Sequence, residues 1–179
     1  MSNNAISISN YLIERSKSVT GRYLKLLGLI KRVYFVHGFS LAIYDRSAID
    51  KRFDTVEAWK LGPVIPSVYH TFKHNKDADI TELGEIILGY DIKDNLDYPE
   101  LKVDTPILKD EDIIKVADMV LTRYKDYTDN DLINLTHLKG SPWQLSYRYG
   151  DNCPISDKLT KMYYSEVIKK SYEVYYQID

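Results

Sequence analysis

The sequence has little that would mark a secreted or membrane-spanning protein. Its 179 residues include one cysteine, Cys153, so no disulfide can form within the chain and nothing suggests an oxidising compartment. No apolar run approaches the roughly 18–20 residues that a membrane span needs. The first residues, Met1-Ser2-Asn3-Asn4, have neither the basic region nor the apolar core of a signal peptide. We therefore expect a cytoplasmic protein that does not bind a membrane, either in its own cell or as the product of a mobile element in a host.

Signatures of cofactor binding and nucleophilic catalysis are also missing. None of the eight glycines stands in a GxGxxG or GxxxxGK pattern, the arrangements that cradle phosphate groups. The GxSxG turn of serine hydrolases is absent. Cys153 lies in the tetrapeptide Asp-Asn-Cys-Pro, where nothing marks it as an activated thiol. The sequence predicts no cofactor and no nucleophilic residue.

The four histidines are poorly placed for a metal. His70 and His74 are four residues apart, but the glutamate that acts as a base in zinc proteases is missing between them. The simpler interpretation is a solvated helix face. His37 lies on an apolar stripe, which is typical of a hydrogen-bonded core histidine. We predict no metal site.

The sequence also lacks an excess of charge of one sign. Lysine and arginine number 24 and the acidic residues 26, which gives a formal net charge of -2. A strongly basic nucleic-acid binder is therefore not expected. The balance conceals a split, because residues 1–75 carry +6, residues 76–131 carry -9 and residues 132–179 carry +1. The acidic stretch is either an electrostatic surface for a basic partner or a set of solvated loops and helix starts.

What the sequence does contain is helical periodicity. Apolar residues recur at spacings of three and four over 23–44, nearly all round the helix, which is typical of a central buried helix. Thr20 is the expected N-cap of this helix, and Gly38 is expected to end or bend it. Other helices are predicted over residues 6–17, 67–74, 81–88, 110–124 and 156–176, and a further short one is capped by Thr128 or Asp129. Pro142-Trp143 opens another segment.

The remaining segments read as connections. Residues 91–105 are predicted to form a loop, and a short extended or hairpin element is expected around residues 52–65, before the sharp punctuation of Gly62-Pro63 and Pro66. The predicted fold class is mainly α: a single compact helical domain over residues 1–179.

One sequence pattern suggests an enzyme. Asp54, Glu57 and Lys60 have the carboxylate, carboxylate and lysine order of nucleases that hold Mg²⁺ beside a scissile phosphate. On a strand, however, Glu57 and Lys60 would face opposite sides. Surface charges around a buried Trp59 explain the same residues. We keep the nuclease as an alternative and predict that the protein is not an enzyme.

Three segments resemble the Panacea family, the SocA-like antitoxins. Residues 26–44 read LLGLIKRVYFVHGFSLAIY, and residues 57–69 read EAWKLGPVIPSVY, with an Ala-Trp pair, Gly-Pro-Val, and then Pro and Tyr. The third segment joins Leu-Thr-His at 135–137 to Ser-Pro-Trp at 141–143. Their order and spacing agree with the family from about residue 8 to about residue 170, while residues 76–108 match no family motif.

The resemblance implies a protein that acts by binding. Such domains are found as antitoxins beside diverse toxins, in phages and other mobile elements, and one related type delivers its toxin to a protease as an adaptor. The implied partners are a cognate toxin and, for an adaptor, a protease or chaperone; no catalytic residues come with the family. The remaining alternative is a phage protein that binds a host factor.

The motif residues are expected mainly to build a scaffold, with some of them bordering a partner groove. Thr136 and His137 are expected to bond the backbone of the loop at Pro142, and the acidic residues 76–131 to tune which partner is bound. The candidate residues are Lys31, Tyr34, Trp59, Gly62, Pro63, Pro66, Tyr69, Thr136, His137, Pro142 and Trp143.

Overall fold

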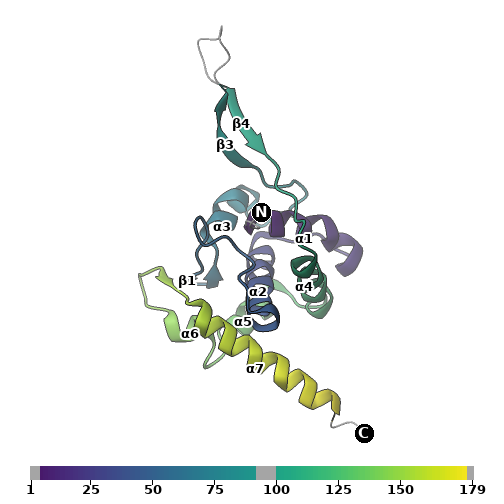
Figure 1. Cartoon of the computed structure of the whole chain (residues 1–179), viewed down its shortest axis with the longest axis vertical. Coiled ribbons are helices and arrows are strands. Elements are labelled where there is room, and N and C mark those ends of the chain that lie inside the picture. Colours follow the sequence, from purple (N-terminus) through teal and green to yellow (C-terminus); the bar gives the residue numbers. More distant parts are fainter. Residues whose placement is uncertain (1–4, 92–99, 177–179) are drawn as a thin grey trace.

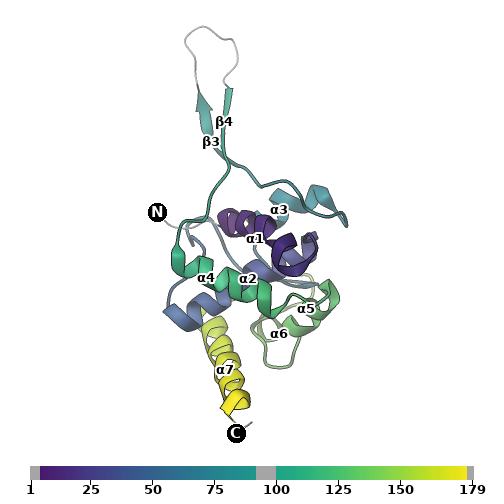
Figure 2. The same ribbon diagram turned by 90° about the vertical axis from the view of Figure 1, so that its right-hand side faces the viewer.

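The computed structural model describes residues 5–91 and 100–176. They form a helical body from which one long hairpin projects (Figures 1 and 2). The helices are α1 (Ala5–Thr20), α2 (Leu26–Tyr44), α3 (Pro66–Phe72), the 3-10 turn η1 (Lys73–Asn75), α4 (Glu111–Arg123), α5 (Asp129–Thr136), α6 (Pro142–Ser146) and α7 (Asp157–Tyr176). The strands are β1 (Glu57–Trp59), β2 (Gly62–Val64), β3 (Ile86–Asp91), β4 (Glu100–Asp104) and β5 (Cys153–Pro154). The mainly α prediction is confirmed.

Helix α2 is the centre of the body, with α1, α4 and α7 packed around it. Its residues from Gly28 to Leu41 are all buried, as expected for a helix that is apolar nearly all round. By length and composition alone α2 could cross a membrane, so the expectation that no segment is long enough was wrong here. In the fold, 78% of that stretch is buried inside the protein, and its apolar side chains form the core.

Two sequence expectations about α2 are corrected. Thr20 is the last residue of α1, whereas α2 begins at Leu26 after Lys25, whose side chain caps no backbone N–H. Gly38 does not end α2, which continues to Tyr44. The ring of Tyr164 lies where a Cβ at Gly38 would be, so this glycine lets α7 approach α2 closely.

The extended element expected around residues 52–65 is a tight hairpin. Strand β1 pairs antiparallel with β2, with Glu57 opposite Val64 and Trp59 opposite Gly62. On its other side β1 pairs with β5, a two-residue strand that the sequence did not predict. The segment that carries Trp59 is therefore paired on one side with β2 and on the other with β5, which comes shortly before the last helix in the sequence.

A second hairpin contradicts two predictions. The helix expected over residues 81–88 does not form, because β3 begins at Ile86. The loop expected over 91–105 contains β4 at 100–104; the rest of that prediction, residues 92–99, lies outside the described part of the chain. Pairing of β3 with β4 joins residues nine to eighteen positions apart in the sequence. The local spacing of apolar residues does not reveal such a partner.

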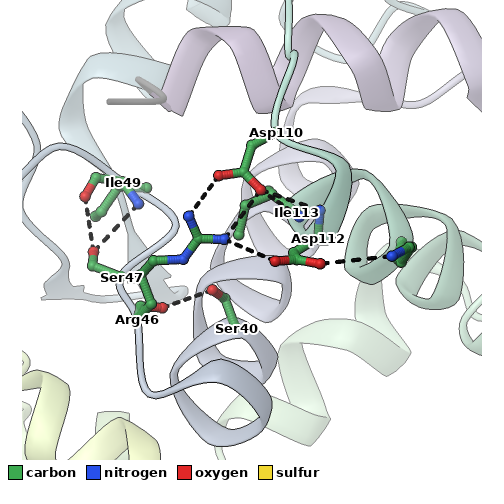
Figure 3. A network of polar contacts seen from close by, with 8 residues as sticks. Ser40, Arg46, Ser47, Ile49, Asp110, Asp112 and Ile113 are labelled. Carbon is green, nitrogen blue, oxygen red and sulfur yellow. Dashed lines mark hydrogen bonds and ion pairs between the residues drawn. The ribbon is translucent and has the colours of Figure 1, made fainter. Parts of the chain in front are cut away.

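The start of α4 is tied to the end of α2 by one arginine (Figure 3). Arg46 donates two hydrogen bonds to the carboxylate of Asp110, at 2.7 and 3.1 Å. Asp110 is also the N-cap of α4, since its Oδ1 accepts the backbone N–H groups of Asp112 and Ile113. Ser40 Oγ donates to the Arg46 carbonyl oxygen at 2.6 Å. The helix predicted over residues 110–124 is confirmed, and its start carries a tertiary contact as well.

Replacing Asp110 with alanine should lower the free energy of unfolding by about 1–2 kcal/mol, because it removes a helix cap together with a surface ion pair. Asp112 is the matched control. It lies one residue into the same helix and also contacts Arg46, at 3.4 Å, but does not serve as the cap. Asp112→Ala should cost about 0.5 kcal/mol or less. Equal losses in urea denaturation would show that the cap contributes nothing of its own.

Candidate functional site

The three family-like segments converge at one place, where α2, β2, α5 and α6 meet. Lys31 comes from the centre of α2, Gly62 and Pro63 from β2, and Thr136 from the end of α5. A hydrogen bond joins the first two segments, in which Lys31 Nζ donates to the Pro63 carbonyl oxygen at 2.9 Å. Residues more than thirty positions apart in the chain are thus held in one cluster.

Lys31 is an unusual component of this cluster because its side chain is fully buried. Among the residues that the structure describes, no carboxylate lies within ion-pairing distance of its Nζ. Burial lowers the pKa of Lys31 to about 7, since a charged ammonium is costly away from water. A large share of the Lys31 side chains is therefore neutral near pH 7.

Gly62 fits against Lys31 for two reasons. Its φ of +106° lies in a region that side chains other than glycine rarely adopt. A Cβ at this position would lie 2.7 Å from Thr136 Oγ1 and 2.9 Å from Lys31 Nζ. The glycine of the Gly-Pro-Val motif is thus required both by the turn and by the close approach of α2 and α5.

His137 and Trp143 form the next layer of the site. Their rings are stacked, with centroids 3.6 Å apart and an interplanar angle of 6°. Burial, together with the nearby Lys31, lowers the pKa of His137, so this imidazole is neutral at pH 7. The indole N–H of Trp143 donates to the Trp59 carbonyl oxygen at 2.8 Å, and Tyr147 stacks on the Trp143 ring at 4.8 Å.

Trp59 extends the aromatic contacts to α3. Its indole N–H donates to Glu57 Oε2 at 2.7 Å, and its ring meets that of Tyr69 edge to face at 4.9 Å. Pro66, the first residue of α3, begins the helix that carries Tyr69. We call the half-buried residues Tyr69, Trp59, His137, Trp143 and Tyr147 the aromatic band.

The candidate residues divide into two groups. Ten of the eleven candidate residues belong to the aromatic band or to the residues beneath it. Pro142 is one of these ten, as the first residue of α6. Tyr34 lies apart, buried against Tyr164 of α7 at a centroid distance of 5.8 Å. The sequence also missed Tyr147, which no motif marked. Its position four residues after Trp143, on the turn that leaves α6, is the signal that could have found it.

The hydrogen bond expected between Thr136 or His137 and the Pro142 loop has a different donor in the structure. Ser141 Oγ donates to the Thr136 carbonyl oxygen at 2.7 Å, whereas the Thr136 hydroxyl donates to Ile133 within α5. His137 contributes by stacking rather than by a hydrogen bond to the loop. The family-like Thr-His and Ser-Pro-Trp elements are thus joined through the serine.

The residues of the nuclease hypothesis have structural partners instead. Asp54 is buried and accepts the Ala5 backbone N–H at 3.0 Å and the Ser67 hydroxyl at 2.5 Å. Glu57 is bound by the Trp59 indole, and Lys60 is exposed. Within residues 5–91 and 100–176, no three metal-binding side chains gather into a group that could hold an ion.

The other histidines lie outside the site. His37 is fully buried, and its Nε2 lies 3.3 Å from Asp157 Oδ1 at the start of α7, so the prediction of a hydrogen-bonded core histidine is confirmed. His70 and His74 are exposed, and His74 falls in η1 rather than on the same helix as His70. They do not share one helix face as the sequence suggested.

Comparison with known proteins identifies the family. A model described as "Antitoxin SocA-like, Panacea domain" matches residues 29–144, a range that includes the cluster from Lys31 to Trp143. The chain belongs to the SocA-like antitoxin family. A similar curated protein, Antitoxin SocA of Caulobacter vibrioides (strain NA1000 / CB15N), is 30% identical over 141 residues, which cover 79% of this chain and 69% of the relative. No solved structure matches the chain.

Proposed function

We propose that this protein is a cytoplasmic antitoxin that neutralises a cognate toxin by binding it. The observation that carries the proposal is the family match over residues 29–144, which takes in all of the aromatic band except Tyr147. The relative named Antitoxin SocA supports the same role. Neutralisation requires a surface that recognises another protein, and the aromatic band has the chemistry for it.

The aromatic band has the composition of the central part of a protein interface. Tryptophan and tyrosine dominate the binding energy of many interfaces, because a rigid ring buries much area at little cost in conformational entropy. Stacking on His137 and Tyr147 and the bond to the Trp59 carbonyl hold the Trp143 ring in place. Such fixed side chains lose little freedom when a partner binds.

An exposed apolar residue adjoins the aromatic band. Leu61, in the turn after Trp59, is 47% exposed. An apolar side chain at the rim of half-buried aromatic rings extends the area that a partner can cover. We place the first toxin contact here. The bound toxin is then either held inactive or handed to a protease, and both routes begin with the same complex.

Co-expression tests the proposal. Each reading frame that neighbours the gene is induced alone and together with this protein, and growth is followed. We expect one product to arrest growth alone and to be tolerated in the presence of the antitoxin. If every neighbouring product gives the same growth with and without this protein, the proposal is contradicted.

A matched pair of variants locates the contact. Leu61→Asp places a charge at the rim of the aromatic band and should reduce rescue, because the charge loses water when the partner covers it. Ile43→Asp is the control. Its side chain is 45% exposed but lies near the end of α2, away from the aromatic band, so rescue should persist. Loss of rescue by both variants, or by neither, would argue against this contact surface.

A further inference from the structure

We propose that the β3–β4 hairpin is a second contact surface of the antitoxin, which binds an extended cationic segment of the toxin along the edge of β3. This inference rests on the proposed function and adds the chemistry of the partner. The hairpin belongs to the acidic stretch of the chain, and it lies within residues 76–108, where the family motifs lapse. A segment outside the family motifs, presented on loops and a hairpin, is suited to partner choice.

The hairpin projects from the body but is fixed at its base. Figures 1 and 2, taken at right angles, both show β3 and β4 extending beyond the helices. Asn10 of α1 holds both of its legs, since its Nδ2 donates to the carbonyl oxygens of Gly84 at 2.9 Å and Pro106 at 3.0 Å. Its Oδ1 also accepts the Gly84 backbone N–H at 2.7 Å. The hairpin is therefore presented to a partner from a defined position.

One face of the hairpin is apolar and uncovered. Ile87 pairs with Val103, and Leu101 lies two residues before Val103 on the same face. These three side chains are 66%, 45% and 48% exposed, respectively. Lys102 and Asp104 occupy the opposite face of β4. A two-stranded hairpin is at best marginally stable in water when its apolar face is open, so a partner that covers this face would stabilise it.

The hairpin also offers backbone hydrogen bonds. Its sheet consists of β3 and β4 alone, so in the described structure each strand has one edge that no other strand pairs. Such an edge can accept an extended segment of another chain, with side chains on alternate faces. A strand added at β3 would place a side chain beside Ile87, on the apolar face, just before the register shift between Ile87 and Gly89.

A cavity at the foot of β3 indicates the charge of the added strand. It has a volume of about 550 Å³ and is lined by Thr71, His74, Glu82, Leu83, Gly84 and Glu85. Glu82 and Glu85 are exposed and come just before β3 begins at Ile86. A lysine or arginine at the end of the added strand would reach these two carboxylates, as charge complementarity favours.

The surrounding charge favours a toxin segment over a second copy of this chain. Within the described residues 77–91 and 100–104 there are seven acidic residues and one lysine. Two copies paired edge to edge would bring these acidic hairpins together, and like charges on neighbouring strands destabilise the pairing. A cationic strand of a different protein is attracted by the same charges.

Calorimetric titration with the neutralised toxin, purified from the rescuing reading frame, tests the inference. The variants are Ile87→Ser with Val103→Ser, and Glu82→Gln with Glu85→Gln. We expect at least a tenfold rise in Kd for each pair, and a weaker salt dependence of binding for the second pair. The control for the first pair is Ile107→Ser, at an exposed apolar residue outside the hairpin. The control for the second pair is Asp126→Asn with Glu173→Gln, which removes two exposed charges elsewhere. The Kd of each control variant should stay within twofold of the wild-type value.

Hydrogen exchange of the complex identifies the paired edge, and we expect slower exchange of the β3 amides at 86–88. Tight toxin binding by the folded hairpin variants, with no change at these amides, would overturn the inference while leaving the proposed function intact. If the wild-type protein neutralises no toxin, the proposed function fails first. A dimer of the isolated protein that Ile87→Ser with Val103→Ser abolishes would identify a second copy as the occupant and overturn the inference as well.

Discussion

Replacing Asn10 with alanine should lower the free energy of unfolding by about 3–5 kcal/mol. Asn10 is buried and makes three hydrogen bonds to the two legs of the β3–β4 hairpin. The substitution would leave the N–H and carbonyl of Gly84 and the carbonyl of Pro106 without their partner. Each buried polar group left in this way costs about 1–3 kcal/mol, and partial relaxation toward water keeps the total below the sum.

Ser9 is the matched control for this loss. It is the preceding residue of α1 and is likewise buried, but its hydroxyl donates only to the Ala5 carbonyl oxygen within the same helix, at 2.8 Å. Ser9→Ala should therefore cost about 1 kcal/mol or less. Urea denaturation followed by circular dichroism compares the two variants. Losses within about 1 kcal/mol of each other would show that Asn10 does not fix the hairpin to the body.

The free energy of unfolding should rise by about 2–3 kcal/mol between pH 7 and pH 9, because of Lys31. Burial lowers the pKa of Lys31 in the folded protein to about 7, while in the unfolded chain it returns to about 10.4. Between these values the unfolded state binds the proton and the folded state does not. Raising the pH through this range therefore favours the folded state, and the full cost of the buried charge is present below about pH 7.

Lys31→Met isolates this contribution. Methionine keeps most of the unbranched apolar stem but has no amine, so the rise in stability between pH 7 and pH 9 should largely disappear. Lys25→Met is the control, because Lys25 precedes the same helix and is exposed; it should keep the wild-type rise. Equilibrium unfolding at several pH values gives the slopes. If Lys31→Met and the wild-type protein show the same slope, the buried amine does not titrate in this range.

The elements that the sequence predicted well are those specified by local signals. Helix α4 has an acidic start, an apolar stripe and a basic end. Of the two caps expected for α5, Thr128 and Asp129, the structure selects Thr128, which forms a full capping box with Asp131. Gly62-Pro63, which the sequence marked as a sharp turn, opens β2 directly after the two-residue turn from β1. In each case the residues that determine the structure are neighbours in sequence.

The parts that the sequence did not predict depend on distant partners. β5 is too short to be recognised except by its pairing with β1. β3 looked helical because Ile86, Ile87 and Leu88 form a short apolar run, which does not distinguish a strand from a helix. Asn10, which fixes this hairpin, carried no signal other than a polar residue within an apolar stretch of α1.

The sequence predicted which residues belong to the candidate site better than it predicted how they pack. The family-like motifs supplied ten of the residues that converge at the junction of α2, β2, α5 and α6. They did not reveal that Tyr34 packs toward α7, because residues three apart on a helix, such as Lys31 and Tyr34, share a face only approximately. The stack of His137 on Trp143 likewise depends on the loop between α5 and α6, whose path no spacing rule defines.

Native mass spectrometry of the purified toxin mixed with this protein tests the central claim most directly, because the claim is that neutralisation occurs by binding. We predict a complex whose mass equals that of the two unmodified chains in a fixed ratio, under conditions in which the toxin has lost its activity. A neutralised toxin of altered mass, with no complex present, would contradict the account and show that the protein acts on the toxin as an enzyme.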